Sequence, residues 1–128
     1  MMSWVSVDSD IVLPPQIVGP SLTVAGLASW VFAHAGREQE AAECGLLQDF
    51  LDTAMHQGVG REVRAPRRVV SRAAELWVEA SGLADSWAIA SEGKASVEWG
   101  RQAERLRVRA ESLRQVLGTA VRGEPPTR

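Results

Sequence analysis

A chain of 128 residues can form one domain with a modest hydrophobic core. Its single cysteine, Cys44, excludes an intramolecular disulfide and does not support a four-ligand zinc site. Residues 1–60 carry seven acidic side chains and one arginine, whereas residues 61–128 carry thirteen basic and nine acidic side chains. This split indicates either a nucleic-acid surface or two oppositely charged surfaces that face each other, within a subunit or between copies. We favour the second interpretation because Glu and Arg alternate through the last predicted helix.

The amino-acid usage points to a high-GC genome, such as that of a bacterium or its phage. Tyrosine and asparagine are absent, and lysine occurs once among the 14 basic residues. Five of the aromatic residues are tryptophan and alanine is plentiful. Large rings beside small side chains favour close packing of helices over a sheet.

Residues 1–20 are predicted to form an extended N-terminal arm, followed by a helical bundle over residues 21–122 and a flexible tail over residues 123–128. Three prolines at positions 14, 15 and 20 disfavour a regular helix in the arm. Its apolar content indicates that the arm lies on its own bundle or on a neighbouring copy, with Trp4 as the anchor. The arm residues predicted to contact a partner are Trp4, Val7, Ile11 and Leu13.

Residues 21–35 are predicted to form the first helix, with Ser21 as its N-cap and Gly36 as its stop. No charged residue occurs from position 11 to position 36. This segment therefore has to be considered as a membrane span, although its prolines and polar residues dilute the hydrophobicity. A core helix, buried within the subunit or between subunits, is the preferred interpretation. Leu27, Trp30 and Val31 complete the predicted partner interface.

Residues 37–57 are predicted to form a second helix with an acidic face and an apolar stripe. The stripe consists of Leu46, Leu47, Phe50, Leu51, Ala54 and Met55. Residues 59–66 are predicted to form a linker, and Pro66 is expected at the first position of the next helix.

Two further series at steps of three and four predict a C-terminal helical hairpin with its turn near residues 91–96. Gly93 lies where the two series change phase, and glycine commonly ends helices. The first series is Val70, Ala73, Trp77, Ala80, Ala84, Trp87 and Ser91. The second series is Trp99, Ala103, Leu106, Ala110, Leu113, Leu117 and Ala120.

Motifs for catalysis or for a cofactor are missing from the sequence. The Gly-Val-Gly at positions 58–60 lacks the lysine of a phosphate-binding loop. The two histidines are 22 positions apart, and the Glu-x-x-His motif of di-iron bundles does not occur. Cys44 is interpreted as a small buried hydrophobe. We therefore predict that the protein is not an enzyme and has no catalytic, cofactor-binding or metal site.

Five arginines gather around the start of the third predicted helix and could contact an anionic partner. They are Arg61, Arg64, Arg67, Arg68 and Arg72. The overall acidic charge and the lack of a helix-turn-helix signature disfavour nucleic acid. An acidic protein surface, such as the second predicted helix of another copy, is the preferred partner.

The dipeptide Trp99-Gly100, close to the predicted hairpin turn, resembles the Trp-x-Gly turn of the small WXG-type secretion substrates of actinobacteria. That resemblance implies a helical hairpin that pairs with a second small helical protein. The middle residue of the motif is missing here, so no residue role is carried over.

Together these patterns predict an all-α fold, a three- to four-helix bundle with a C-terminal helical hairpin and an extended N-terminal arm. The predicted function is a non-enzymatic protein–protein interaction module, an oligomeric assembly, adaptor or structural component whose partner is itself or another component. A secretion-type partner protein, a nucleic-acid-binding regulator and a single-span membrane protein, through residues 11–36, remain as alternatives. Because no signal peptide is visible, the expected location is the cytoplasm or a virion-like assembly.

Overall fold

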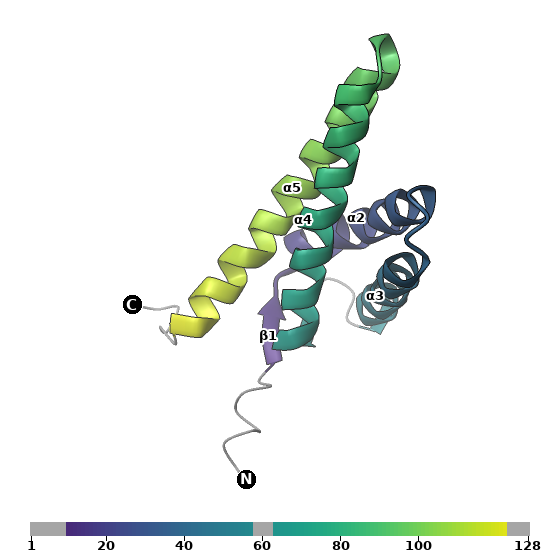
Figure 1. Ribbon diagram of the computed structural model, residues 1–128. Helices are drawn as coiled ribbons and strands as arrows, with labels where there is room; N and C mark the ends of the chain where they lie inside the picture. The colour runs from purple at the N-terminus through teal and green to yellow at the C-terminus, as the bar shows by residue number, and fades with distance from the viewer. Residues whose placement is uncertain (1–9, 58–62, 123–128) are drawn as a thin grey trace.

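The computed structural model describes residues 10–57 and 63–122. Over these residues the predicted all-α bundle is confirmed, with a short two-stranded sheet added to it. Figure 1 shows α4 and α5 as one long hairpin, with α2 and α3 packed beside its lower half. The elements in chain order are β1 (Asp10–Leu13), α2 (Pro15–His34), α3 (Glu38–Gln57), β2 (Val63–Pro66), α4 (Arg67–Ala90) and α5 (Gly93–Arg122).

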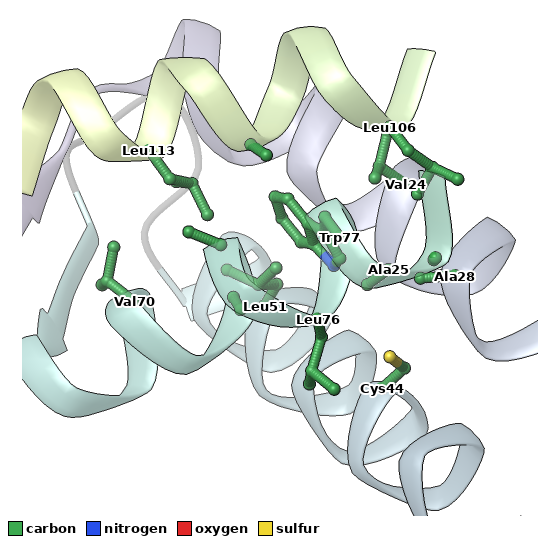
Figure 2. Close-up of a cluster of buried hydrophobic side chains, with 14 of the residues drawn as sticks. Val24, Ala25, Ala28, Cys44, Leu51, Val70, Leu76, Trp77, Leu106 and Leu113 are labelled. Atoms are coloured by element: carbon green, nitrogen blue, oxygen red, sulfur yellow. The ribbon is translucent and has the colours of Figure 1, made fainter. Parts of the chain in front are cut away.

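The α4–α5 hairpin follows the two predicted series. Trp77, in the middle of α4, is fully buried, and Figure 2 shows its ring at the centre of the core between Leu106 and Leu113. Small residues on both helices let their backbones approach closely around this ring. The other buried positions of the two series are Val70, Ala73, Ala80, Ala84, Ala103 and Ala110.

The turn of the hairpin is tighter than the sequence suggested. Only Ser91 and Glu92 separate α4 from α5, and Gly93 begins α5 with a φ of 64°. The Ser96 hydroxyl donates a hydrogen bond of 2.7 Å to the Ala88 carbonyl and so joins the two helix ends. Trp99-Gly100 consequently lies inside α5 and not in the turn.

Helix α2 is the central helix of the lower half, since it packs on α3, α4 and α5. Its buried face consists of Val18, Ser21, Val24, Ala25, Ala28, Val31 and Phe32. By length and composition α2 is also the one helix in the described ranges that could cross a membrane.

The first helix begins six residues earlier than predicted, at Pro15 instead of Ser21. Pro15 occupies the first helical turn, where an N–H would have no intrahelical acceptor, and the Ile17 N–H bonds to the Pro14 carbonyl at 2.9 Å. Pro20 lies within the helix and leaves the carbonyl of exposed Gln16 without its helical donor. The prediction of an extended arm to residue 20 was therefore too long.

Gly36 separates α2 from α3, with a φ of 76°. The Arg37 N–H bonds to the Phe32 carbonyl at 2.8 Å and the Gly36 N–H bonds to the Ala33 carbonyl at 3.1 Å. This pair of bonds is the Schellman motif, which satisfies the last carbonyls of a helix when glycine takes the left-handed conformation.

The segment predicted as a linker contains β2, which pairs antiparallel with β1. Leu13 is opposite Val63, and Ile11 is opposite Ala65. All four of these side chains are buried and belong to the hydrophobic core. Pro66 ends β2, so that α4 begins at Arg67, one residue later than expected.

Candidate interaction surfaces

Four aromatic rings from three helices form a cluster where the end of α2 meets the hairpin. Trp30 and Trp99 stack with their ring centroids 5.2 Å apart. Trp87 meets the Trp99 ring edge-on at 4.6 Å, and His34 meets Trp87 edge-on at 4.9 Å. We call Trp30, His34, Trp87 and Trp99 the aromatic cluster. Trp87 and Trp99 are the series positions next to the hairpin turn, which explains why they meet each other there.

The aromatic cluster leaves a large apolar surface open to solvent. The exposed fraction of Trp30 is 53%, whereas Trp77 is fully buried. His34 is exposed as well, and Trp87 and Trp99 are half-buried. An exposed tryptophan whose ring is already held by neighbours is typical of an interface anchor.

A second surface is the α2–α5 groove, an open depression of about 900 Å³. Arg101, Arg105 and Arg109 follow one another at steps of four along α5 and therefore share one face. The wall contributed by α2 carries no charge. The groove is lined by Pro20, Thr23, Val24, Arg101, Glu104, Arg105, Val108 and Arg109.

The third surface is the α3–α4 groove, an open depression of about 790 Å³. Leu46 and Phe50, from the predicted apolar stripe of α3, have exposed fractions of 69% and 37% here. The groove is lined by Glu43, Leu46, Leu47, Phe50, Arg68, Val69 and Arg72.

A bidentate ion pair joins α3 to α4 at this groove. Nε of Arg72 donates to one carboxylate oxygen of Glu43 at 2.9 Å, and a terminal nitrogen donates to the other at 2.8 Å. These bonds lower the pKa of the Glu43 carboxyl, and the same pair raises the pKa of Arg72. Arg72 also bonds to Glu75 at 3.3 Å. Its guanidinium is thus engaged within the chain.

Four of the five predicted arginines lie in β2 and the first turns of α4, and two of them line the same groove. Arg68 and Arg72 line the α3–α4 groove, but Arg64 is exposed on β2. A buried terminal nitrogen of Arg67 has no hydrogen-bond partner among the described residues. Arg61 lies outside the described ranges.

The predicted partner interface divides into buried and exposed members. Ile11, Leu13 and Val31 are buried in the subunit's own core, because the strand pairing and the packing of α2 cover them, and this part of the prediction is corrected. Leu27 is half-buried and Trp30 is exposed, so these two can still reach a partner. Trp4 and Val7 lie outside the described ranges.

Sequence reasoning missed the role of two sets of side chains. Trp87 and Trp99 were assigned to the hairpin seam alone, without the contact that Trp30 and His34 make with them. For the last helix, the sequence analysis noted only that Glu and Arg alternate. The step of four between the arginines was a visible signal of a basic face, but the uncharged wall opposite this face comes from α2, which is distant in sequence.

The described residues contain no group of three or more His, Cys, Asp or Glu that could hold a metal ion. Cys44 is buried, and burial raises the pKa of its thiol to about 12. The thiol is therefore protonated near neutral pH, whereas nucleophilic cysteines react as thiolates. The His34 imidazole contacts the three tryptophan rings of the aromatic cluster.

Comparisons with protein-family models, with curated proteins and with solved structures each found no match. The functional argument consequently depends on the surfaces described above.

Proposed function

We propose that the protein is a non-enzymatic helical interaction module, an assembly, adaptor or structural component that binds other copies of itself through the aromatic cluster. The observation that carries this proposal is the 53% exposure of Trp30 on a ring stack. A tryptophan side chain buries up to about 250 Å². At about 25 cal/mol per Å², covering the exposed half of Trp30 would contribute roughly 3 kcal/mol to association.

The ring stack also lowers the cost of binding. Trp30 stacks on Trp99 and on His34, with its ring centroid 5.7 Å from the imidazole. Because these neighbours already orient the indole, it loses little rotational freedom when a partner covers it. Such a pre-organised aromatic anchor supports a protein-binding role over a catalytic one.

The alternatives have less support in the same observations. The burial of one face of α2 against α3, α4 and α5 favours a core helix over a membrane span. The engagement of Arg72 with Glu43 weakens the case for a regulator that binds nucleic acid through the arginines at positions 61–72.

Substitution of Trp30 by alanine tests the proposal. Light-scattering mass after size exclusion, at two protein concentrations in detergent-free buffer, is expected to show an oligomer for the unmodified chain. The Trp30→Ala variant is expected to have a lower mass, because the anchor is lost. Ile89→Ala is the matched control, since Ile89 is 85% exposed and lies outside the aromatic cluster.

The circular dichroism of both variants should equal that of the unmodified chain, because neither side chain belongs to the core. An unmodified chain that stays at its subunit mass of 13.9 kDa at both concentrations would contradict self-association. An oligomer that Trp30→Ala leaves intact would remove the aromatic cluster from the interface.

A further inference from the structure

Acidic and basic side chains are concentrated on opposite flanks of the subunit. Helix α3 carries five acidic residues and no lysine or arginine, whereas α5 carries seven basic and three acidic residues. Figure 1 shows α3 and α5 on opposite sides of α4. The two flanks therefore cannot neutralise each other within one subunit.

The basic flank includes a built groove. Arg101, Arg105 and Arg109 line the α2–α5 groove. Arg101 also bonds to Glu98 at 3.1 Å, and the acidic residue of the lining, Glu104, accepts a hydrogen bond of 2.8 Å from Arg107. Val108, which is 44% exposed, supplies an apolar contact between the arginines. The groove thus combines the positive charge of its arginines with one exposed apolar side chain and an uncharged wall formed by α2.

The acidic flank presents matching chemistry on α3. Glu38, Asp49 and Asp52 are exposed and lie within about 60° of one another around the helix, given 100° per residue. Leu46, which is 69% exposed, borders them. Glu40 and Glu43 are already paired within the chain with arginines, and the Asp52 carboxylate lies 3.4 Å from Nδ1 of the exposed His56.

We propose that α3 of one copy docks in the α2–α5 groove of the next copy. The carboxylates of Glu38, Asp49 and Asp52 face the arginines of the groove, and Leu46 covers Val108. This inference rests on the proposed self-association and names a surface for it that is separate from the exposed ring of Trp30.

The arrangement is head to tail, because the donor helix and the acceptor groove are different surfaces of each copy. Such heterologous contacts do not end at a dimer unless the rotation closes a ring. Assembly is expected to grow with protein concentration and to weaken with added salt, since exposed ion pairs are screened within about 10 Å at 0.1 M ionic strength.

Two charge-reversal variants test the contact from its two sides. The groove variant carries Arg105→Glu and Arg109→Glu, and the helix variant carries Asp49→Arg and Asp52→Arg. Each variant alone is expected to form smaller assemblies than the unmodified chain, because only the contact through the aromatic cluster remains. The matched control is Arg114→Glu, because Arg114 is exposed on α5 but does not line the groove.

A mixture of the two variants provides the sharpest result. The groove variant keeps an intact α3 and the helix variant keeps an intact groove, so one α3–groove contact can form between the two and no second one of this kind can follow. An equimolar mixture is expected to have a higher mass than either variant alone, because each pair of variants regains one such contact. A chain carrying all four substitutions is expected to recover oligomers, because both charges are reversed.

The outcomes separate this inference from the proposed function. Oligomers that both variants retain at the mass of the unmodified chain, but that Trp30→Ala dissociates, would overturn the docking of α3 and leave self-association in place. A mixture whose mass does not exceed that of either variant alone would also overturn it. Groove variants that keep their mass but lose binding to a duplex DNA probe would assign the groove to nucleic acid instead.

Discussion

The α4–α5 hairpin and the α2–α3 pair are both two helices joined by a short connection, but they are stabilised differently. Both helices of the hairpin bury a regular series of side chains around Trp77. In the α2–α3 pair, α2 is buried along a whole face, while the buried residues of α3 are Cys44 and Leu51. Helix α3 is thus the least anchored helix, and its exposed surface is available for contacts outside the subunit.

The largest expected effect comes from removing the ring at the centre of the hairpin. Trp77→Ala should lower the free energy of unfolding by about 3–5 kcal/mol, because it leaves a cavity in a fully buried site. Phe50→Ala in α3 should cost roughly 2 kcal/mol, because Phe50 is 37% exposed and leaves a smaller buried volume empty. Urea denaturation followed by circular dichroism measures both values. Equal costs would show that α3 is anchored as firmly as the hairpin.

A glycine pair in the α2–α3 region should give effects of opposite sign. Gly36→Ala forces a side chain into the left-handed region and should destabilise the fold by about 1–2 kcal/mol. Gly45→Ala lies inside α3 with no atom within 4 Å of the added Cβ, and should stabilise the fold by up to about 1 kcal/mol. Thermal unfolding of the two variants provides the comparison. A neutral Gly36→Ala would mean that the connection between α2 and α3 can relax without cost.

The smallest expected effect concerns the ion pair that ties α3 to α4. Because Arg72 lowers the pKa of Glu43 in the folded chain, the pair stabilises the fold above the ordinary Glu pKa of 4.5. This contribution is lost as the pH falls through the lowered pKa of Glu43. Both side chains are more than a third exposed, so solvent screening limits the contribution to roughly 0.5 kcal/mol.

Glu43→Gln should therefore reduce the stability slightly at pH 7 and by less at pH 3. Urea titrations at the two pH values measure the difference. Glu111→Gln is a suitable control, because Glu111 is exposed on α5. A loss of the same size at both pH values would mean that the ion pair does not stabilise the contact between the helices.

These differences explain what the sequence could and could not predict. The hairpin was predictable because each of its helices carries its own series, and the two series meet across one short turn. The burial of α2 followed from its lack of charge. The apolar stripe of α3 indicated a helix correctly, but its pattern could not show that Leu46 and Phe50 remain exposed.

The sheet and much of the candidate site depend on contacts between distant segments. Each strand has four residues, and the pairing joins Leu13 to Val63 across both α2 and α3. Trp30 was assigned to the partner interface from the sequence, but its stack on Trp99 could not be predicted, because it depends on how α2 crosses the hairpin. For the same reason Ile11 and Leu13 were assigned to a partner when β2 and the bundle cover them.

The pairing of β1 with β2 also has a consequence for how the chain folds. The hairpin forms from neighbours in sequence, so its contacts require little loop closure and can appear early. The β1–β2 pairing brings together two segments that are separated in sequence by α2 and α3. The entropy cost of closing so long a loop opposes this pairing until α2 and α3 have packed. We therefore expect folding of this chain to begin in its C-terminal half, with the N-terminal strand added last.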